Sequence, residues 1–230
     1  MRLDKYLSNA GTGSRKEVGG LIKKGQVTVN GSVVKSPKVS VTYQDDILIG
    51  TEKVNLEAFI YIMLHKPQGV ISSTEDEAET VIDIIDHAQA GELFPVGRLD
   101  KDTTGLLLIT NDGKLAHKLT SPKKHHGKTY EVILRDAVSE EDLDALREGI
   151  PLKDFFTKPA EAEKIDEQKV HLTITEGKFH QVKRMFQYLG NEVTGLKRIS
   201  FASLPLDEKL KPGEYRSLSS EELDILRNLV

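Results

Sequence analysis

An unbroken apolar run at residues 106–109, bounded by Gly105 and by the polar residues 110–113, constrains the fold most. A run of this length between turn-forming residues is typical of a fully buried β-strand. Arg98 and Asp100 precede it two positions apart, so on an extended backbone their side chains point to the same side. The pattern predicts a polar turn on a rigid strand, with both groups in one cleft. A plain surface salt bridge is the commoner outcome of such spacing.

Four motifs occur in a fixed order along the chain. They are Lys66-Pro67-Gln68-Gly69, the segment Gly97 to Gly113 with Gly-Arg-Leu-Asp at its start, Lys128-Thr129-Tyr130, and Glu176 to Met185 with His-Gln-Val-Lys-Arg-Met at its end. Together they resemble the RNA pseudouridine synthases over most of residues 59–216. The last two motifs are most similar to the branch that modifies small-subunit ribosomal RNA. The resemblance implies an enzyme that isomerises a uridine in that RNA to pseudouridine.

The resemblance also implies roles for matched residues. Asp100 would be the indispensable carboxylate, which either attacks the sugar or removes a sugar proton. Lys183, where many relatives carry arginine, would be the cation beside it, and Tyr130 the aromatic face that holds the base. Without the resemblance, Tyr130 is more simply a core aromatic of a strand. Arg98 would fill the space that a flipped-out uridine leaves. Further substrate contacts are expected from Leu99, Thr103, Lys66, His180, Gln181 and Arg184.

The implied reaction detaches uracil from ribose, rotates it and rejoins it through a ring carbon, so it consumes no cofactor. The chain has no glycine-rich phosphate loop and no dinucleotide fingerprint. Cysteine is absent, and adjacent His125 and His126 point apart on an extended chain without a ligand pair at helical spacing. We therefore expect neither a cofactor nor a metal site.

The length of 230 residues allows a small and a medium domain. The N-terminus lacks a cationic segment followed by an apolar one, and no stretch approaches the roughly 18 apolar residues of a membrane span. The absence of cysteine suits a reducing compartment. We expect a cytoplasmic protein, a monomer without a membrane segment.

Residues 1–58 have the pattern of a helix–helix–hairpin module. Leu3, Leu7 and Ala10 form an apolar stripe at helical spacing, and Ser14 with Glu17 forms a capping box for a second helix. Asn30-Gly31 lies between two short β-branched runs and predicts a hairpin. The order of elements resembles the small S4 RNA-binding domain.

Basic side chains gather in this module although the whole chain has a net charge of −4. Residues 1–44 hold eight lysines and arginines against one aspartate and one glutamate. On the polar sides of the two helices they would follow RNA phosphates, although an ordinary cationic solvent face has the same composition. The expected RNA contacts are Arg2, Lys5, Arg15, Lys16, Lys23 and Lys24.

Residues 59–230 predict an α+β catalytic domain with a mixed, mainly antiparallel sheet flanked by helices. Strand patterns cover residues 59–64, 106–109, 129–134 and 170–174, and helix patterns cover residues 114–119, 140–147, 179–189 and 221–229.

Two other functions are compatible with this sequence. One is a synthase of the same family that modifies large-subunit RNA. The other is a non-catalytic RNA-binding or ribosome assembly factor that kept the fold, although such a factor has no chemical need for Asp100, Arg98 and Tyr130 together. In each case the expected partner is ribosomal RNA or an assembling ribosomal subunit.

Overall fold

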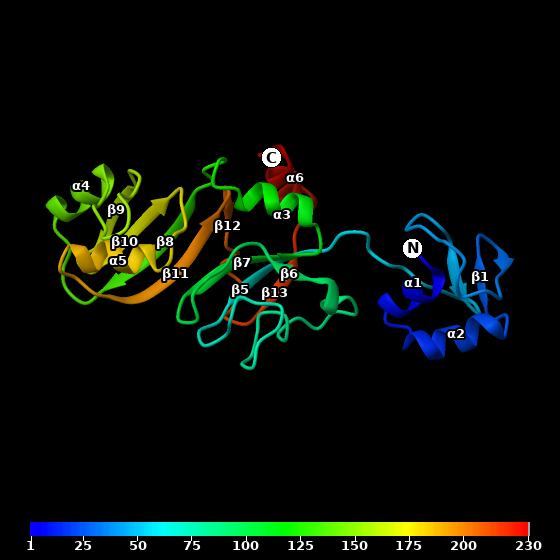
Figure 1. The fold of residues 1–230 in the computed structure, drawn as a ribbon. Helices are drawn as coiled ribbons and strands as arrows, with labels where there is room; N and C mark the ends of the chain where they lie inside the picture. The colour runs from blue at the N-terminus through cyan, green and yellow to red at the C-terminus, as the bar shows by residue number, and fades with distance from the viewer. Residues whose placement is uncertain (230) are drawn as a thin grey trace. The chain divides into compact units, whose positions relative to one another are not determined.

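The computed structural model describes residues 1–229, which form two compact units (Figure 1). The first comprises Met1–Ile60 with the later segment Asp86–Leu93, and the second comprises Tyr61–Ile85 with residues 94–229. Asn9 Nδ2 donates to Glu92, and Gln89 Nε2 donates to the carbonyl oxygen of Glu57 at 3.2 Å. The segment Asp86–Leu93, which contains the 3₁₀ turn η1 (Ala90–Glu92), therefore belongs to the first unit, although the sequence assigned it to the catalytic domain expected from residue 59 onward.

The first unit has two helices and a four-stranded antiparallel sheet. Ser14 Oγ accepts from the Glu17 amide while the Glu17 carboxylate accepts from the Ser14 amide, so the predicted capping box is confirmed. The predicted hairpin turn is also present, with φ of 51° at Asn30 and 78° at Gly31. The elements are α1 (Leu3–Asn9), α2 (Arg15–Lys23), β1 (Val27–Val29), β2 (Ser32–Val33), β3 (Ile47–Ile49) and β4 (Glu52–Lys53), in the sheet order β2-β1-β3-β4.

The second unit is built on one long mixed sheet. Its strands are β5 (Tyr61–Lys66), β6 (Phe94–Pro95), β7 (Thr104–Thr110), β8 (Lys128–Leu134), β9 (Glu161–Asp166), β10 (Lys169–Ile174), β11 (Val193–Phe201), β12 (Leu204–Pro205) and β13 (Tyr215–Ser217). The main order is β13-β5-β7-β11-β8-β10-β9, with β6 paired to β7 and β12 to β11. Every pair is antiparallel except β7 with β11, so the predicted fold class is confirmed.

Four helices accompany this sheet: α3 (Gly113–Thr120), α4 (Glu140–Glu148), α5 (Gln181–Tyr188) and α6 (Ser220–Asn228). Figure 1 shows α4 and α5 beside the part formed by β8, β9 and β10, and α3 and α6 beside the part that includes β7 and β12. Asp112, Ser139 and Ser219 cap α3, α4 and α6 through their side chains, as their sequence patterns predicted. Within residues 1–229, every helix is too short or too polar to cross a bilayer.

Several boundaries differ from the predicted ones. Helix α5 begins at Gln181 rather than at residue 179, because His180 has φ 48° and ψ 31°, the left-handed conformation, which interrupts a right-handed helix. The first strand of the second unit, β5, begins two residues later than predicted. Strands β9, β11 and β13 were not predicted, since their charged residues and Gly195 obscure the alternation of apolar side chains.

Strand β11 joins the two parts of the sheet, because it pairs with β7 on one side and with β8 on the other. Gly105 makes the close approach of β7 possible. A Cβ atom on Gly105 would lie 2.2 Å from the carbonyl oxygen of Arg198, a distance that no side chain tolerates. The glycine that precedes the apolar run therefore fixes where the turn with Asp100 meets β11.

Candidate active site

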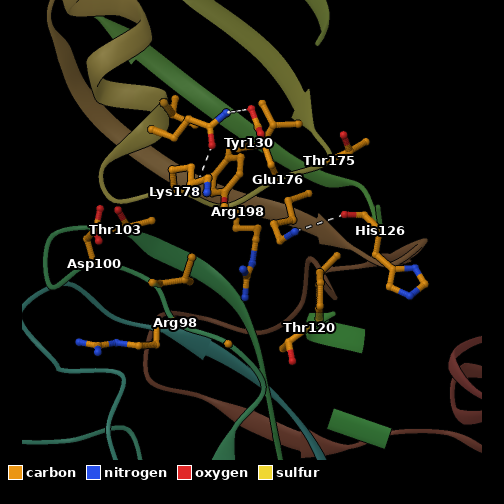
Figure 2. A pocket seen from close by; sticks show the side chains of 18 of the residues that line it. Arg98, Asp100, Thr103, Thr120, His126, Tyr130, Thr175, Glu176, Lys178 and Arg198 are labelled. Carbon is orange, nitrogen blue, oxygen red and sulfur yellow. Dashed lines mark hydrogen bonds between the residues drawn. The ribbon is translucent and has the colours of Figure 1, made fainter. Parts of the chain in front are cut away.

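A cavity of about 440 Å³ opens in the second unit, a volume in the range of small-molecule sites. Residues 96–100 and Thr103 before β7 form one wall, and the end of α3 forms another. Strands β8 and β11, the segment that leads from β10 into α5, and the first turn of α5 line the rest, together with Lys158. Figure 2 shows labelled side chains from these elements around the cavity. All of the lining lies within the second unit.

Lys66 supports the turn of residues 99–103, which carries Asp100, through hydrogen bonds to its backbone. Its ammonium group donates to the backbone carbonyls of Pro67 at 3.1 Å, Asp100 at 3.1 Å, Lys101 at 3.4 Å and Thr103 at 2.9 Å. Its side chain has no exposed surface and does not line the cavity. Burial lowers the pKa of Lys66 to about 8, and the charges of the nearby aspartates oppose that shift. Lys66 was expected to bind substrate; the structure places its ammonium group on the backbone of the turn, and the substrate contact stays a prediction.

Ser72 and Gly69 add further bonds to the same turn. The Ser72 hydroxyl accepts from the amide of Leu99 at 3.0 Å and donates to the carbonyl of Leu99 at 2.9 Å. The amide of Gly69 donates to the carbonyl of Lys101 at 2.8 Å. The first and second sequence motifs are therefore parts of one structure. Sequence reasoning missed Ser72, because a loop serine beside Ser73 and Thr74 carries no distinguishing pattern.

The Asp100 carboxylate lies in the cavity with a histidine and a lysine nearby. Its Oδ2 atom is 3.7 Å from Nε2 of His180 and 3.9 Å from Nζ of Lys183. Lys183 has a closer partner in Asp102, whose Oδ1 is 2.5 Å from the ammonium group. This hydrogen bond lowers the pKa of Asp102 below its usual value. The structure thus brings Lys183 near Asp100 as expected, but Asp102, which the sequence did not indicate, shares the cation.

Three other expected residues line the cavity from the same turn. Arg98 is exposed and, within residues 1–229, forms no ion pair with Asp100. Leu99 is 5% exposed and Thr103 is 1% exposed. The Thr103 hydroxyl has no hydrogen-bond partner within residues 1–229. Arg98 and Asp100 therefore line one cavity, as their spacing predicted, without the salt bridge that is the commoner outcome of such spacing.

Tyr130 and Arg198 stand opposite each other on strands β8 and β11. Both line the cavity, and Figure 2 shows them as neighbours between Asp100 and His126. Arg198 Nε donates to the carbonyl of Leu106 at 2.8 Å, and its guanidinium carbon lies 5.0 Å from the centre of the Phe201 ring. Burial lowers the pKa of Arg198, and its contact with Tyr130 opposes the shift. Sequence reasoning missed Arg198, although its alternation with buried Leu196 is a signal once β11 is known.

The remaining expected contacts at α5 differ in position. His180 lines the cavity and stacks on Phe179 with ring centres 3.8 Å apart. Gln181 also lines it, but its amide group is used internally, accepting from the amide of Lys178 and donating to Glu176. Arg184 does not line the cavity. It pairs with Asp154 and lies over the Phe155 ring, because it projects from another face of the helix, and its expected substrate contact stays a prediction.

The cavity is rich in cations. Lys128 Nζ donates to the carbonyl of His126 at 3.3 Å, and burial lowers the pKa of Lys128, with the charge of Arg198 adding to that shift. Lys158, Lys178 and Lys183 also line the cavity. The carboxylates among the lining residues are Asp100 and Glu176. Such a surplus of positive charge favours an anionic ligand such as a nucleotide of RNA.

The six basic residues expected to contact RNA in the first unit are all exposed: Arg2, Lys5, Arg15, Lys16, Lys23 and Lys24. Arg2 is tied to Asp4, with 2.6 Å between Nη2 and Oδ2, and this bond lowers the pKa of Asp4. The other five are free to meet phosphates in solution. The capped N-terminus of α2 lies among them.

Two family models match this chain. The model of RNA pseudouridylate synthases matches residues 60–188, and the S4 domain model matches residues 1–47. The chain is 50% identical to the RNA pseudouridine synthase YtzG of Bacillus subtilis and 46% identical to ribosomal small subunit pseudouridine synthase A of Pasteurella multocida. Each alignment covers 97% or more of both chains. A crystal structure of a pseudouridylate synthase has a TM-score of 0.71 and 44% identity over 98% of this chain and 99% of that one.

The chain therefore belongs to the family of RNA pseudouridylate synthases, and it carries an S4 domain at its N-terminal end. The membership predicted from the four motifs is confirmed.

Proposed function

We propose that this protein isomerises one uridine of small-subunit ribosomal RNA to pseudouridine and that Asp100 acts directly in the reaction. The observation that carries the proposal is the Asp100 carboxylate, which lies in a cation-lined cavity 3.7 Å and 3.9 Å from two basic groups. Relatives from several bacteria, 43–46% identical over nearly the full chain, are named ribosomal small subunit pseudouridine synthase A. That name supports the choice of RNA.

The roles of the cavity residues follow from their positions. Both routes considered for this family, attack on the sugar and removal of a sugar proton, need an ionised carboxylate at Asp100. The Lys183 ammonium group lies 3.9 Å from Oδ2 of Asp100 and places a positive charge beside that carboxylate. Tyr130 provides a ring against which the detached uracil rotates before its carbon five bonds to the sugar. Arg98, exposed at the rim, is suited to fill the space in an RNA stem that the flipped uridine leaves.

The substrate would be ribosomal RNA, free or within an assembling subunit, bound by the S4 domain through the exposed basic groups of α1 and α2. The protein would work as a monomer in the cytoplasm, where ribosomes assemble. Because the family reaction is an isomerisation, we propose that it uses no cofactor.

The test has two parts. Pseudouridines in ribosomal RNA are mapped in cells with and without the gene, and loss of one site in the small-subunit RNA is expected. Purified protein is then mixed with RNA that carries tritium on carbon five of uracil, where label should be released to water. Loss of a large-subunit site would instead assign the related activity, and absence of release on any ribosomal fragment or particle would favour a non-catalytic assembly factor.

A further inference from the structure

Arg198 is a buried cation in the cavity wall with a donor left over. Its side chain is 2% exposed, and Nε is occupied by the carbonyl of Leu106. Its Nη2 atom is buried and has no hydrogen-bond partner within residues 1–229. A buried guanidinium donor without a partner is rare and calls for a ligand or water to satisfy it.

Atoms of this kind are concentrated at the cavity. In the described part of the chain, the buried side-chain polar atoms without a partner are Nη2 of Arg198, Oγ1 of Thr103 and Nε2 of His126, and all three residues line this cavity. Such a concentration indicates that the missing partners come from what occupies the cavity.

Arg198 pairs across the sheet with the strand of Tyr130 and with the strand that follows Asp100. It is the cross-strand partner of Tyr130 on β8 and of Gly105 on β7, which directly follows the turn with Asp100 and Thr103. Directly opposed residues of an antiparallel pair project from the same face, so the Arg198 and Tyr130 side chains lie on one face of the sheet, where both line the cavity (Figure 2). Phe201 and the Leu106 carbonyl fix its orientation.

Depth in the cavity distinguishes the two ends of a bound nucleotide. The Asp100 side chain is 33% exposed, whereas Arg198 is almost completely buried. The ribose remains attached to the RNA backbone and must meet Asp100, so the base edge farthest from the ribose reaches deepest. In uracil that edge carries the carbonyl oxygen O4.

We propose that Arg198 donates a hydrogen bond from Nη2 to O4 of the target uracil and thereby determines that the enzyme accepts uracil and rejects cytosine. This inference rests on the proposed function. Cytosine has an amino group in place of O4, and a guanidinium group has donors only, so two donors would face each other. A buried donor left unpaired by the wrong base gives strong discrimination.

The test measures binding rather than turnover. Dissociation constants of the full-length protein are determined by ligand-observed NMR for uridine 5′-monophosphate, cytidine 5′-monophosphate, and the 2-thio and 4-thio forms of the uridine nucleotide. Uridine monophosphate should bind about tenfold or more tighter than the cytidine nucleotide, as expected for a charge-assisted hydrogen bond. The 4-thio form should bind more weakly and the 2-thio form should match the parent, because sulfur is a poor acceptor.

Variants assign the effect to one side chain. Arg198→Met should bind the four nucleotides with equal affinity. Lys197→Met is the matched control, since Lys197 is the preceding cation of β11, does not line the cavity, and should leave the preference intact. Asp100→Asn should keep the preference for the uridine nucleotide while losing tritium release. Binding therefore tests the role of Arg198, and tritium release tests the proposed function.

Three results would overturn the inference. The first is a folded Arg198→Met protein that still prefers the uridine nucleotide. The second is wild-type protein that binds uridine and cytidine nucleotides, or the 2-thio and 4-thio forms, equally well. The third is displacement of the nucleotides by inorganic phosphate together with equal affinities, which would make Arg198 a phosphate ligand. If Arg198→Met does not fold, the wild-type comparison of the four nucleotides decides.

Discussion

The basic groups of the first unit and two buried basic groups of the second unit differ in what surrounds them. Arg15, Lys16 and Lys23 are exposed on α2, where water and ions surround them. Lys66 and Arg198 are buried, and backbone carbonyls accept their hydrogen bonds. Exposed cations attract phosphates from any direction and lose strength as salt rises. Buried cations are fixed in place, so they act through geometry. Positive charge therefore contributes to RNA affinity in the first unit, and it holds groups in fixed positions in the second.

Asp100→Asn should have the largest effect. The change keeps the shape but removes the charge that either route requires, so tritium release should fall by more than about a thousandfold. RNA affinity should stay equal or rise slightly, because one negative charge near the phosphates is lost. Appreciable release by this variant would refute the catalytic assignment of Asp100.

Lys66→Met should come next. It removes the ammonium group that four carbonyls share, and a turn displaced by about 1 Å costs on the order of a hundredfold in turnover. RNA affinity should change little, since Lys66 does not line the cavity. Turnover close to the wild-type rate, in a variant with an unchanged melting curve, would show that the turn does not depend on Lys66.

Lys66 also predicts a pH dependence. Burial lowers its pKa to about 8, so above that pH the amine keeps only two donors for the carbonyls and turnover should fall. The free energy of unfolding should change in the opposite direction and rise with pH. From about pH 8 to the usual lysine range, the unfolded chain holds a proton that the folded protein has released, so this residue's contribution to the unfolding free energy rises with pH. Rate profiles from pH 7 to 10 measure the turnover, and denaturant melts over the same range measure the free energy of unfolding. A rate that is flat across pH 8 would contradict the predicted fall in turnover.

The exposed cations are tested together by replacing Arg15, Lys16, Lys23 and Lys24 with alanine. Affinity for ribosomal RNA should fall by roughly tenfold or more, and the slope of log affinity against log salt should become shallower by as much as about 3. Maximal turnover should persist. The control replaces Lys35 and Lys38, exposed basic residues of the same unit outside the helices. Equal slopes for both variants would mean that the helices form no particular RNA surface.

Arg98→Ala should slow turnover on a stem-loop by about tenfold, because the vacated stack is no longer filled. A single-stranded RNA with the same uridine should be affected less. Lys101→Ala, which removes another exposed cation of the same turn, is the control. If Arg98→Ala slowed both RNAs equally, the flipping role would be abandoned.

Asp102→Asn should have the smallest effect, a loss of up to about fivefold, since exposed ion pairs contribute about 1 kcal/mol or less. Asp102 is the closer partner of Lys183 and fixes where the ammonium group lies relative to Asp100. Lys183→Met should lose more activity than Asp102→Asn. The reverse order would mean that Asp102 itself takes part in the reaction.

What the sequence predicted correctly rests on local signals. The capping box at Ser14, the Asn30-Gly31 turn and the strand after Gly105 depend on neighbouring residues and were all found. Arg198 was missed because its partner Leu106 is 92 positions away. Lys66 and Arg184 were assigned to substrate because their motif was recognised, but a motif does not say which way a side chain points. Helical phase turns Arg184 toward Asp154, away from the cavity that Lys183 lines.

The turn with Asp100 is held through its main chain, which matters for how such an enzyme evolves. Lys66, Ser72 and Gly69 bind carbonyl and amide groups of residues 99–103 and no side chain of that turn. Position 101 is exposed and contributes its backbone carbonyl to this support, so its side chain is open to mutation while the carboxylate stays in place. A lineage can therefore change the charge beside the active site at this position without first losing its chemistry.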